Sequence, residues 1–148
     1  MAKPRLLKQF SVSLVGAEDA VREGIAQTMA CLAPLELGEE EAGTVQLVLA
    51  EALNNVVEHA LAGTRGMTLV EIRGSVGDHF LELVVIDEGS AMQEGHAPRP
   101  NAPDVGGDMA DLPEGGFGWF LINTLAQDIR YERRGKFNHL SLRLPISH

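Results

Sequence analysis

Three polar clusters combine residue types and spacings that could carry chemistry. The first is Glu51, Asn55 and His59, which lie four residues apart and therefore along one line of a helix. A carboxylate can act as a general base, and an amide oxygen is a hard ligand that suits Mg²⁺. On an arbitrary helix these residues would form a solvated face, and a helical histidine more often packs or orients a neighbour. Because asparagine is a poor helix former, the pair Asn54-Asn55 in mid-helix indicates a polar role.

The second cluster, Asp87-Glu88-Gly89, follows an apolar stretch. An aspartate at the end of a buried strand can accept a hydrogen bond from an exocyclic amine, and a glycine lets the backbone turn close to a ligand. Aspartate and glycine are also the usual residues of a turn that merely ends a strand. This cluster therefore supports a ligand site only in combination with others.

The third cluster is the glycine-rich segment EGGFGWFL at residues 114–121. Glycines just before a helix leave backbone N–H groups to face an anion, and the helix N-terminus adds partial positive charge. A flexible hinge into a core helix would have the same composition. The segment ends a proline- and glycine-rich stretch, residues 88–115, whose length is typical of a lid or binding loop. It is not a dinucleotide-binding fingerprint, since no strand directly precedes it.

Hydrophobic periodicity predicts the elements that must position these clusters. In chain order they are a strand at 10–15, a helix from Gly16 to Pro34, a helix over 39–63, strands over 67–76 and 79–87, a helix opened by 116–118, and strands over 129–133 and 137–144. Turns at Gly77-Asp78 and Arg134-Gly135 would join two hairpins. This order favours an α+β fold, a two-layer sandwich with helices on one face of a mostly antiparallel sheet, in a single domain of 148 residues.

The composition argues against several function classes. The 12 basic and 21 acidic residues give a net charge of −9, which disfavours nucleic acid and anionic membranes as partners. The single cysteine, Cys31, excludes an intrachain disulfide and a cysteine-built zinc site, and it suits a reducing compartment. The sequence has no Walker phosphate loop and no apolar run of about 20 residues, and the absence of an apolar stretch in residues 1–10 leads us to expect no signal peptide. We therefore expect a cytoplasmic domain.

In their order and spacing, the three clusters resemble the boxes of a known superfamily. Residues 49–60 (LAEALNNVVEHA) resemble the N-box of the histidine-kinase-like (GHKL) ATPases, residues 86–89 (IDEG) the G1 box, and residues 116–121 (GFGWFL) the G2 box. Within that superfamily, the segment GGFGWFLINTLAQDIRYE and the length of the chain are similar to those of the anti-sigma factor serine/threonine-protein kinases of bacterial partner-switching systems. The resemblance covers nearly the whole chain.

The resemblance implies a Bergerat-type α/β sandwich that binds ATP and Mg²⁺ between the helices and a mobile lid at residues 88–115. Glu51 matches the catalytic base that deprotonates a serine hydroxyl on a partner. Asn55 matches the Mg²⁺ ligand, and Asp87 matches the residue that reads the adenine amine.

The resemblance also assigns the glycines. Gly89 supports the adenine pocket, and Gly116 and Gly118 match the loop that contacts the phosphates. His59 falls on an N-box position, where we expect it to pack or orient. The chain departs from many sensor kinases in lacking a second glycine two residues after Gly89. Arg99 lies in an acidic lid and could reach a phosphate or remain a solvated surface residue.

By resemblance, the substrate is a serine on a small anti-anti-sigma (STAS-domain) protein, and the second partner is a sigma factor held by a protein–protein surface. A homodimer is common in that family. One alternative is a non-catalytic module that binds ATP as a conformational ligand and sequesters a partner. Another is the catalytic domain of a sensor kinase, which usually accompanies a separate phosphoacceptor-histidine domain.

Overall fold

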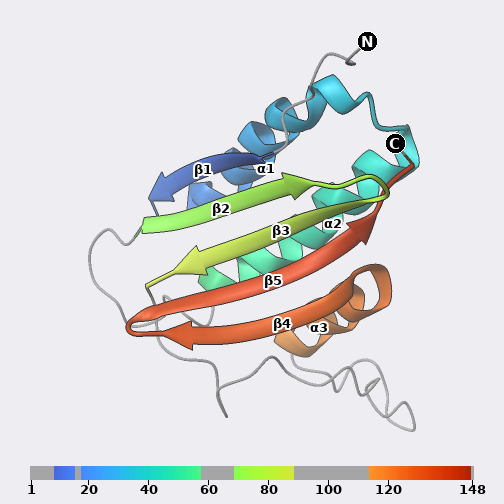
Figure 1. The fold of residues 1–148 in the computed structure, drawn as a ribbon. Helices are drawn as coiled ribbons and strands as arrows, with labels where there is room; N and C mark the ends of the chain where they lie inside the picture. The colour runs from blue at the N-terminus through green and yellow to red at the C-terminus, as the bar shows by residue number, and fades with distance from the viewer. Residues whose placement is uncertain (1–8, 16–17, 58–68, 89–113, 148) are drawn as a thin grey trace, which may run out of the picture.

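The computed structural model describes residues 9–15, 18–57, 69–88 and 114–147. Its elements are β1 (Gln9–Val15), α1 (Glu18–Leu32), a 3₁₀ turn (Ala33–Leu35), α2 (Glu39–Asn55), β2 (Leu69–Val76), β3 (Phe80–Asp87), α3 (Glu114–Leu125), β4 (Gln127–Arg134) and β5 (Phe137–Pro145). The five strands form one sheet in the order β1-β2-β3-β5-β4, and every neighbouring pair is antiparallel. The described helices lie together behind this sheet (Figure 1). The predicted α+β two-layer sandwich is confirmed.

The helix boundaries follow local chemistry. Three glutamates, residues 39–41, occupy the first turn of α2, where carboxylates complement the positive end of the helix dipole. The α2 helix begins where the sequence predicted, and residues 56 and 57 continue it in the wider π-helical geometry. The remainder of the predicted helix, residues 58–63, lies outside the described residues. Helix α1 gives way to the 3₁₀ turn that contains Pro34, as predicted.

Both predicted hairpins are present. The N–H of Gly77 donates to the carbonyl oxygen of Phe80 at 2.8 Å and closes the turn between β2 and β3. Arg134 pairs with Phe137, so the β4–β5 turn consists of Gly135 and Lys136, one residue later than predicted. Gly135 has φ +59°, a left-handed conformation that glycine adopts without a steric cost, and this explains the shift.

The hydrophobic core fills the space between helices and sheet. Its fully buried members alternate along the strands and recur on one face of each helix; they include Ile72, Leu81, Leu83, Leu142 and Leu144 from the sheet, and Leu49, Leu53 and Ile122 from the helices. The inward rows of β3 and β5 end in Asp87 and Asn138, which are also buried. Two polar residues therefore extend the apolar rows on the side that faces the helices.

Helix α2 and strand β3 end at the same end of the molecule. The backbone N–H of Ser147, just beyond β5, donates to Glu41 Oε2 at 2.6 Å in the first turn of α2. Since β5 is antiparallel to β3, this contact places the start of α2 beside the start of β3. The 17 residues of α2 span about 25 Å and the eight residues of β3 about 26 Å, so the two elements also end together. Figure 1 shows both running to the same side.

Helix α3 begins toward that same end. Only Ala126 separates α3 from β4, so the helix ends where β4 begins. Strand β4 then returns to Arg134, which lies beside the start of β5 and hence near the end of β3. Helix α3 packs against α2. The fold therefore places the end of α2 and the end of β3 at one end of the sheet, and α3 runs from the start of β4 back along α2 toward that end (Figure 1).

Two helix glycines predict opposite effects of the same substitution. A Cβ built on Gly43 in α2 meets nothing within 4 Å, whereas one on Gly24 in α1 comes within 2.9 Å of the side chains of Leu14 and Leu53. We expect Gly43→Ala to raise the free energy of unfolding by about 0.5–1 kcal/mol, because alanine costs less backbone entropy in a helix. We expect Gly24→Ala to lower the free energy of unfolding by about 1 kcal/mol, because the added methyl group overpacks the core. Urea unfolding followed by circular dichroism measures both, and changes of the same sign would contradict this packing.

Candidate functional site

Asp87 and Asn138 form the buried polar end of the sheet. They stand directly opposite each other in the antiparallel β3–β5 ladder, and only 4% and 2% of their surfaces are exposed. The Nδ2 group of Asn138 donates to Asp87 Oδ1 at 2.9 Å. A buried carboxylate that accepts an amide hydrogen bond is held in a defined direction, which is what recognition of a ligand donor requires.

Two residues of β4 complete this cluster. The hydroxyl of Tyr131 donates to Asn138 Oδ1 in a short hydrogen bond, and Arg133 Nη1 donates to the same oxygen at 3.0 Å. Arg133 Nε also donates to the carbonyl oxygen of Gly135, at 3.2 Å, in the hairpin turn. Together Asp87, Asn138, Tyr131 and Arg133 form a hydrogen-bonded cluster across three neighbouring strands.

Asn138, Tyr131 and Arg133 were not predicted from the sequence. One pattern could have pointed to Asn138, because it stands two residues before the inward alternation of Leu140, Leu142 and Leu144. An inward polar residue at the end of such a row needs a partner. The identity of that partner depends on the register with β3, which lies outside local sequence.

Asn55 is buried near the end of α2, so the solvated-face interpretation is wrong for this residue. Only 5% of its surface is exposed, and its Nδ2 has no hydrogen-bond partner among the described residues. An unpaired buried amide donor costs free energy, so a site that retains one is suited to a ligand with an acceptor oxygen. Glu51, one turn earlier, is partly exposed and remains accessible.

The glycine segment lies within α3. The helix begins at Glu114, two residues before the predicted start at Gly116, so the glycines fall in its first turns instead of preceding it. An acidic residue at the first position is favourable at the positive end of the helix. The N–H groups of a first turn have no intrahelical acceptor and can face an anion, and Gly116 belongs to that turn. Gly118 follows in the next turn.

Three predicted residues cannot be placed. His59, Gly89 and Arg99 lie outside the described residues, as does most of the segment 88–115. Of the predicted site residues that are described, the fold places Asn55 and Asp87 at one end of the sheet, with Glu51 one helical turn away, and α3, which contains Gly116 and Gly118, packs against α2.

The donor set of this end fits a magnesium–phosphate ligand. Within the described ranges, no three His, Cys, Asp or Glu side chains are grouped so that they could hold a metal ion. Magnesium is commonly bound by one or two protein oxygens together with the phosphates of its ligand. The buried amide of Asn55 supplies a carbonyl oxygen for such a cation and an NH₂ group that can donate to a phosphate or water oxygen.

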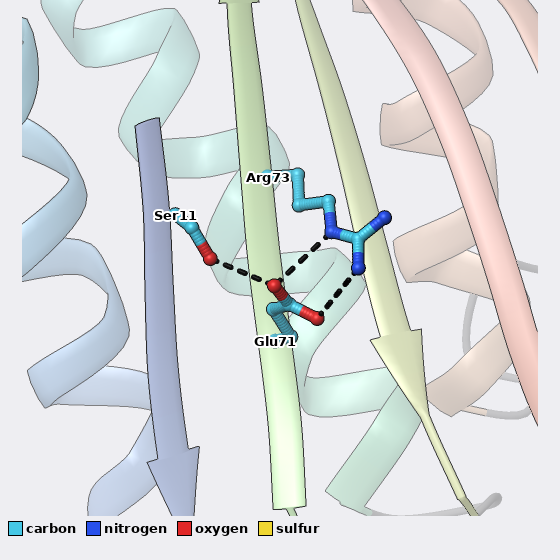
Figure 2. A network of polar contacts seen from close by, with 3 residues as sticks. All are labelled: Ser11, Glu71 and Arg73. Carbon is cyan, nitrogen blue, oxygen red and sulfur yellow. Dashed lines mark hydrogen bonds and ion pairs between the residues drawn. The ribbon is translucent and has the colours of Figure 1, made fainter. Parts of the chain in front are cut away.

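A second polar cluster lies on the other face of the sheet, away from the helices. Figure 2 shows Ser11 Oγ donating to Glu71 Oε2 at 2.7 Å, and Arg73 donating from Nε to Oε2 at 3.1 Å and from Nη2 to Oε1 at 3.2 Å. These hydrogen bonds, from Arg73 first and then Ser11, lower the pKa of Glu71 below 4.5. The side chains of Arg73 and Glu71 remain 60% and 30% exposed, so solvent screens the ion pair.

We expect this cluster to make a small, pH-dependent contribution to stability. A lowered pKa means that the stabilisation is present above pH 4.5 and is lost as the pH falls through the folded-state pKa. Glu71→Gln should therefore cost at most about 1 kcal/mol at neutral pH. The difference from the wild-type chain should shrink in acid. Urea unfolding of both chains between neutral pH and pH 3, roughly one unit below the ordinary carboxylate pKa, measures this difference in stability. A difference that grows in acid would contradict the lowered pKa of Glu71.

Comparison with known proteins identifies the family. A profile of the histidine kinase-like ATPase domain matches residues 15–144. The chain therefore belongs to the histidine kinase-like ATPase domain family, and the resemblance drawn from its three boxes is confirmed. Among the described residues, none of the helices is both long and apolar enough to cross a membrane.

Curated relatives share part of their sequence with this chain. The serine-protein kinase RsbW of Bacillus thuringiensis (strain Al Hakam) is 32% identical over 87 residues, which cover 58% of this chain and 53% of the relative. The protein of the same name from Halalkalibacterium halodurans is 36% identical over 89 residues, covering 57% of this chain and 51% of the relative. The chain thus matches about half the length of these relatives.

A solved structure shares the fold. The crystal structure of the RsbU and RsbW domains of a Mycobacterium tuberculosis protein superposes with a TM-score of 0.65 and 15% identity. The superposition covers 95% of this chain and 33% of that chain. At this identity the likeness bears on the architecture, which is the same two-layer arrangement, and not on the chemistry.

Proposed function

We propose that this chain is an ATP-dependent protein serine kinase of the anti-sigma type. In this proposal it phosphorylates a serine on a small anti-anti-sigma (STAS-domain) protein and sequesters a sigma factor through a protein–protein surface. Family membership and the serine-protein kinase relatives support it. The observation that carries it is that a buried carboxylate, Asp87, and a buried amide whose Nδ2 has no hydrogen-bond partner among the described residues, Asn55, lie at the same end of the fold.

The three site residues Glu51, Asn55 and Asp87, which the structure describes, each have a role in this chemistry. Asp87 accepts a hydrogen bond from the adenine amine, and Asn55 holds Mg²⁺ through its amide oxygen. Glu51, partly exposed, accepts the proton of the serine hydroxyl as that oxygen bonds to the γ-phosphorus and ADP departs. Bound Mg²⁺ neutralises charge on the phosphate oxygens. The reaction depends mostly on positioning and charge neutralisation, because phosphoryl transfer asks little covalent chemistry of the protein.

The proposal extends to parts of the chain without a described structure. The segment predicted as the lid, residues 88–115, covers the nucleotide, with its last two residues already in the first turn of α3. Gly89 supports the adenine pocket, and His59 packs or orients within the N-box. Gly116 and Gly118 contact the phosphates from the start of α3. The chain acts as one domain, in the cytoplasm, and the family resemblance suggests a homodimer.

Phosphorylation of a partner tests the proposal directly. The purified chain is mixed with γ-³²P-ATP, Mg²⁺ and a STAS-domain protein encoded next to it, and we expect acid-stable label on a serine of the partner. Acid-labile label would instead indicate phosphohistidine and a sensor-kinase reaction. In parallel, Mg·ATP should raise the melting temperature, because a ligand that binds only the native state stabilises it. A chain that neither binds Mg·ATP nor labels the partner would refute the proposal.

A further inference from the structure

The orientation of the Asn138 side chain is determined by its neighbours on β4. Arginine can only donate hydrogen bonds, and Arg133 Nη1 lies 3.0 Å from Asn138 Oδ1. The hydroxyl of Tyr131 donates to the same oxygen. Two donors facing one oxygen require that the NH₂ group of this amide point the other way. That group lies 2.9 Å from Asp87 Oδ1, so the amide donates to the carboxylate.

The position of this chain of hydrogen bonds makes it rigid. Asp87, Asn138 and Arg133 occupy one row across β3, β5 and β4, in directly opposed register. Asn138 is 2% exposed and Asp87 is 4% exposed, so water does not offer alternative partners. In such surroundings a hydrogen bond is strong, and a side chain that loses its partner is costly. The carboxylate of Asp87 is therefore held in one direction by residues of the neighbouring strands.

We propose that Asn138 and Tyr131 are positioning residues that orient the Asp87 carboxylate toward the 6-amino group of a purine nucleotide. The inference rests on the proposed function, because it assigns the base preference of that same site. Tyr131 acts through Asn138, to which its hydroxyl donates, and Asn138 acts through Asp87. Loss of either one lets the carboxylate turn, which weakens the hydrogen bond to the amino group more than the contacts to ribose and phosphates.

The test compares two nucleotides that differ at one group. Calorimetry measures the Kd of Mg·ATP and of Mg·purine riboside triphosphate, which lacks the 6-amino group, for the wild-type chain, Tyr131→Phe and Asn138→Ala. The ratio of the two Kd values reports recognition of the amine. General loosening of the fold weakens both ligands alike and leaves the ratio unchanged, so the ratio separates positioning from a merely structural role.

We expect the wild-type chain to prefer ATP and both variants to lose part of that preference. Loss of one hydrogen bond between Tyr131, Asn138 and Asp87 should reduce the preference for ATP over purine riboside triphosphate about three- to tenfold. Lys136→Gln is the matched control. Lys136 lies in the same hairpin, its ammonium group pairs with Glu88 Oε2 at 3.1 Å, and its side chain is 70% exposed. This control should leave the ratio at the wild-type value.

The outcomes separate this inference from the proposed function. A wild-type chain that binds ATP, with an unchanged ratio in both variants, overturns the positioning role and leaves the proposed function standing. A wild-type chain that binds both nucleotides equally overturns the reading of the amine by Asp87. A wild-type chain that binds neither nucleotide overturns both. Because Tyr131→Phe removes a single oxygen atom, it keeps the test valid should Asn138→Ala fail to fold.

Discussion

Glu51→Gln is expected to abolish phosphorylation of the STAS-domain partner while leaving the affinity for Mg·ATP within about twofold of wild type. A general base contributes about 10²–10⁴-fold to the rate, and a neutral amide cannot take the hydroxyl proton. Glutamine has nearly the same shape and helix propensity as glutamate, and position 51 is partly exposed, so α2 should remain intact. Single-turnover transfer of labelled phosphate and calorimetry with Mg·ATP measure the two effects separately.

A matched substitution elsewhere on the same helix controls this result. Glu40 is exposed in the first turn of α2, so Glu40→Gln removes a charge of the same kind without touching the site. We expect it to transfer phosphate at the wild-type rate. Transfer that survives Glu51→Gln would show that the proposed base is wrong. A wild-type chain that binds Mg·ATP and a partner without any transfer would instead favour the non-catalytic ATP-binding module.

Asp87→Asn is expected to weaken binding of Mg·ATP by about 100-fold or more. The substitution replaces a carboxylate that accepts hydrogen bonds with an amide whose NH₂ must face another donor, either the adenine amine or the NH₂ of Asn138. Hydrogen bonds to charged groups contribute about 1.5–3 kcal/mol, and a buried donor left unpaired adds a further penalty. With 4% of its surface exposed, the residue gains little compensation from water.

Calorimetry on a folded variant checks this expectation. Asp78→Asn provides the matched control, because Asp78 is exposed in the β2–β3 turn at the opposite end of β3 and should leave affinity unchanged. The thermal transition without nucleotide establishes that the Asp87 variant is folded. Affinity retained in a folded Asp87→Asn chain would remove Asp87 from the adenine site. The two substitutions together separate binding, which depends on Asp87, from transfer, which depends on Glu51.

The sequence by itself determined the elements and the family. Strand alternation such as that of Phe10, Val12 and Leu14, and the helical spacing in α2, are local patterns, and local patterns can be recognised without knowing which segments meet. The boxes around Glu51 and Asp87 could be recognised for the same reason, since each lies within one short segment. The start of α3 and the β4–β5 turn differed from prediction by two residues and one residue, as glycine-rich boundaries are weakly encoded.

Only the tertiary structure decided how these residues are surrounded. Whether Asn55 faces solvent or the interior depends on what packs against α2, and the packing buried it. The bond between Asp87 and Asn138 joins residues 51 positions apart, and it exists only in the observed β3–β5 register. A slip of one residue would turn Asn138 to the opposite face of the sheet, because side chains alternate with a period of two. Contacts of this kind depend on long-range pairing, which no local pattern specifies.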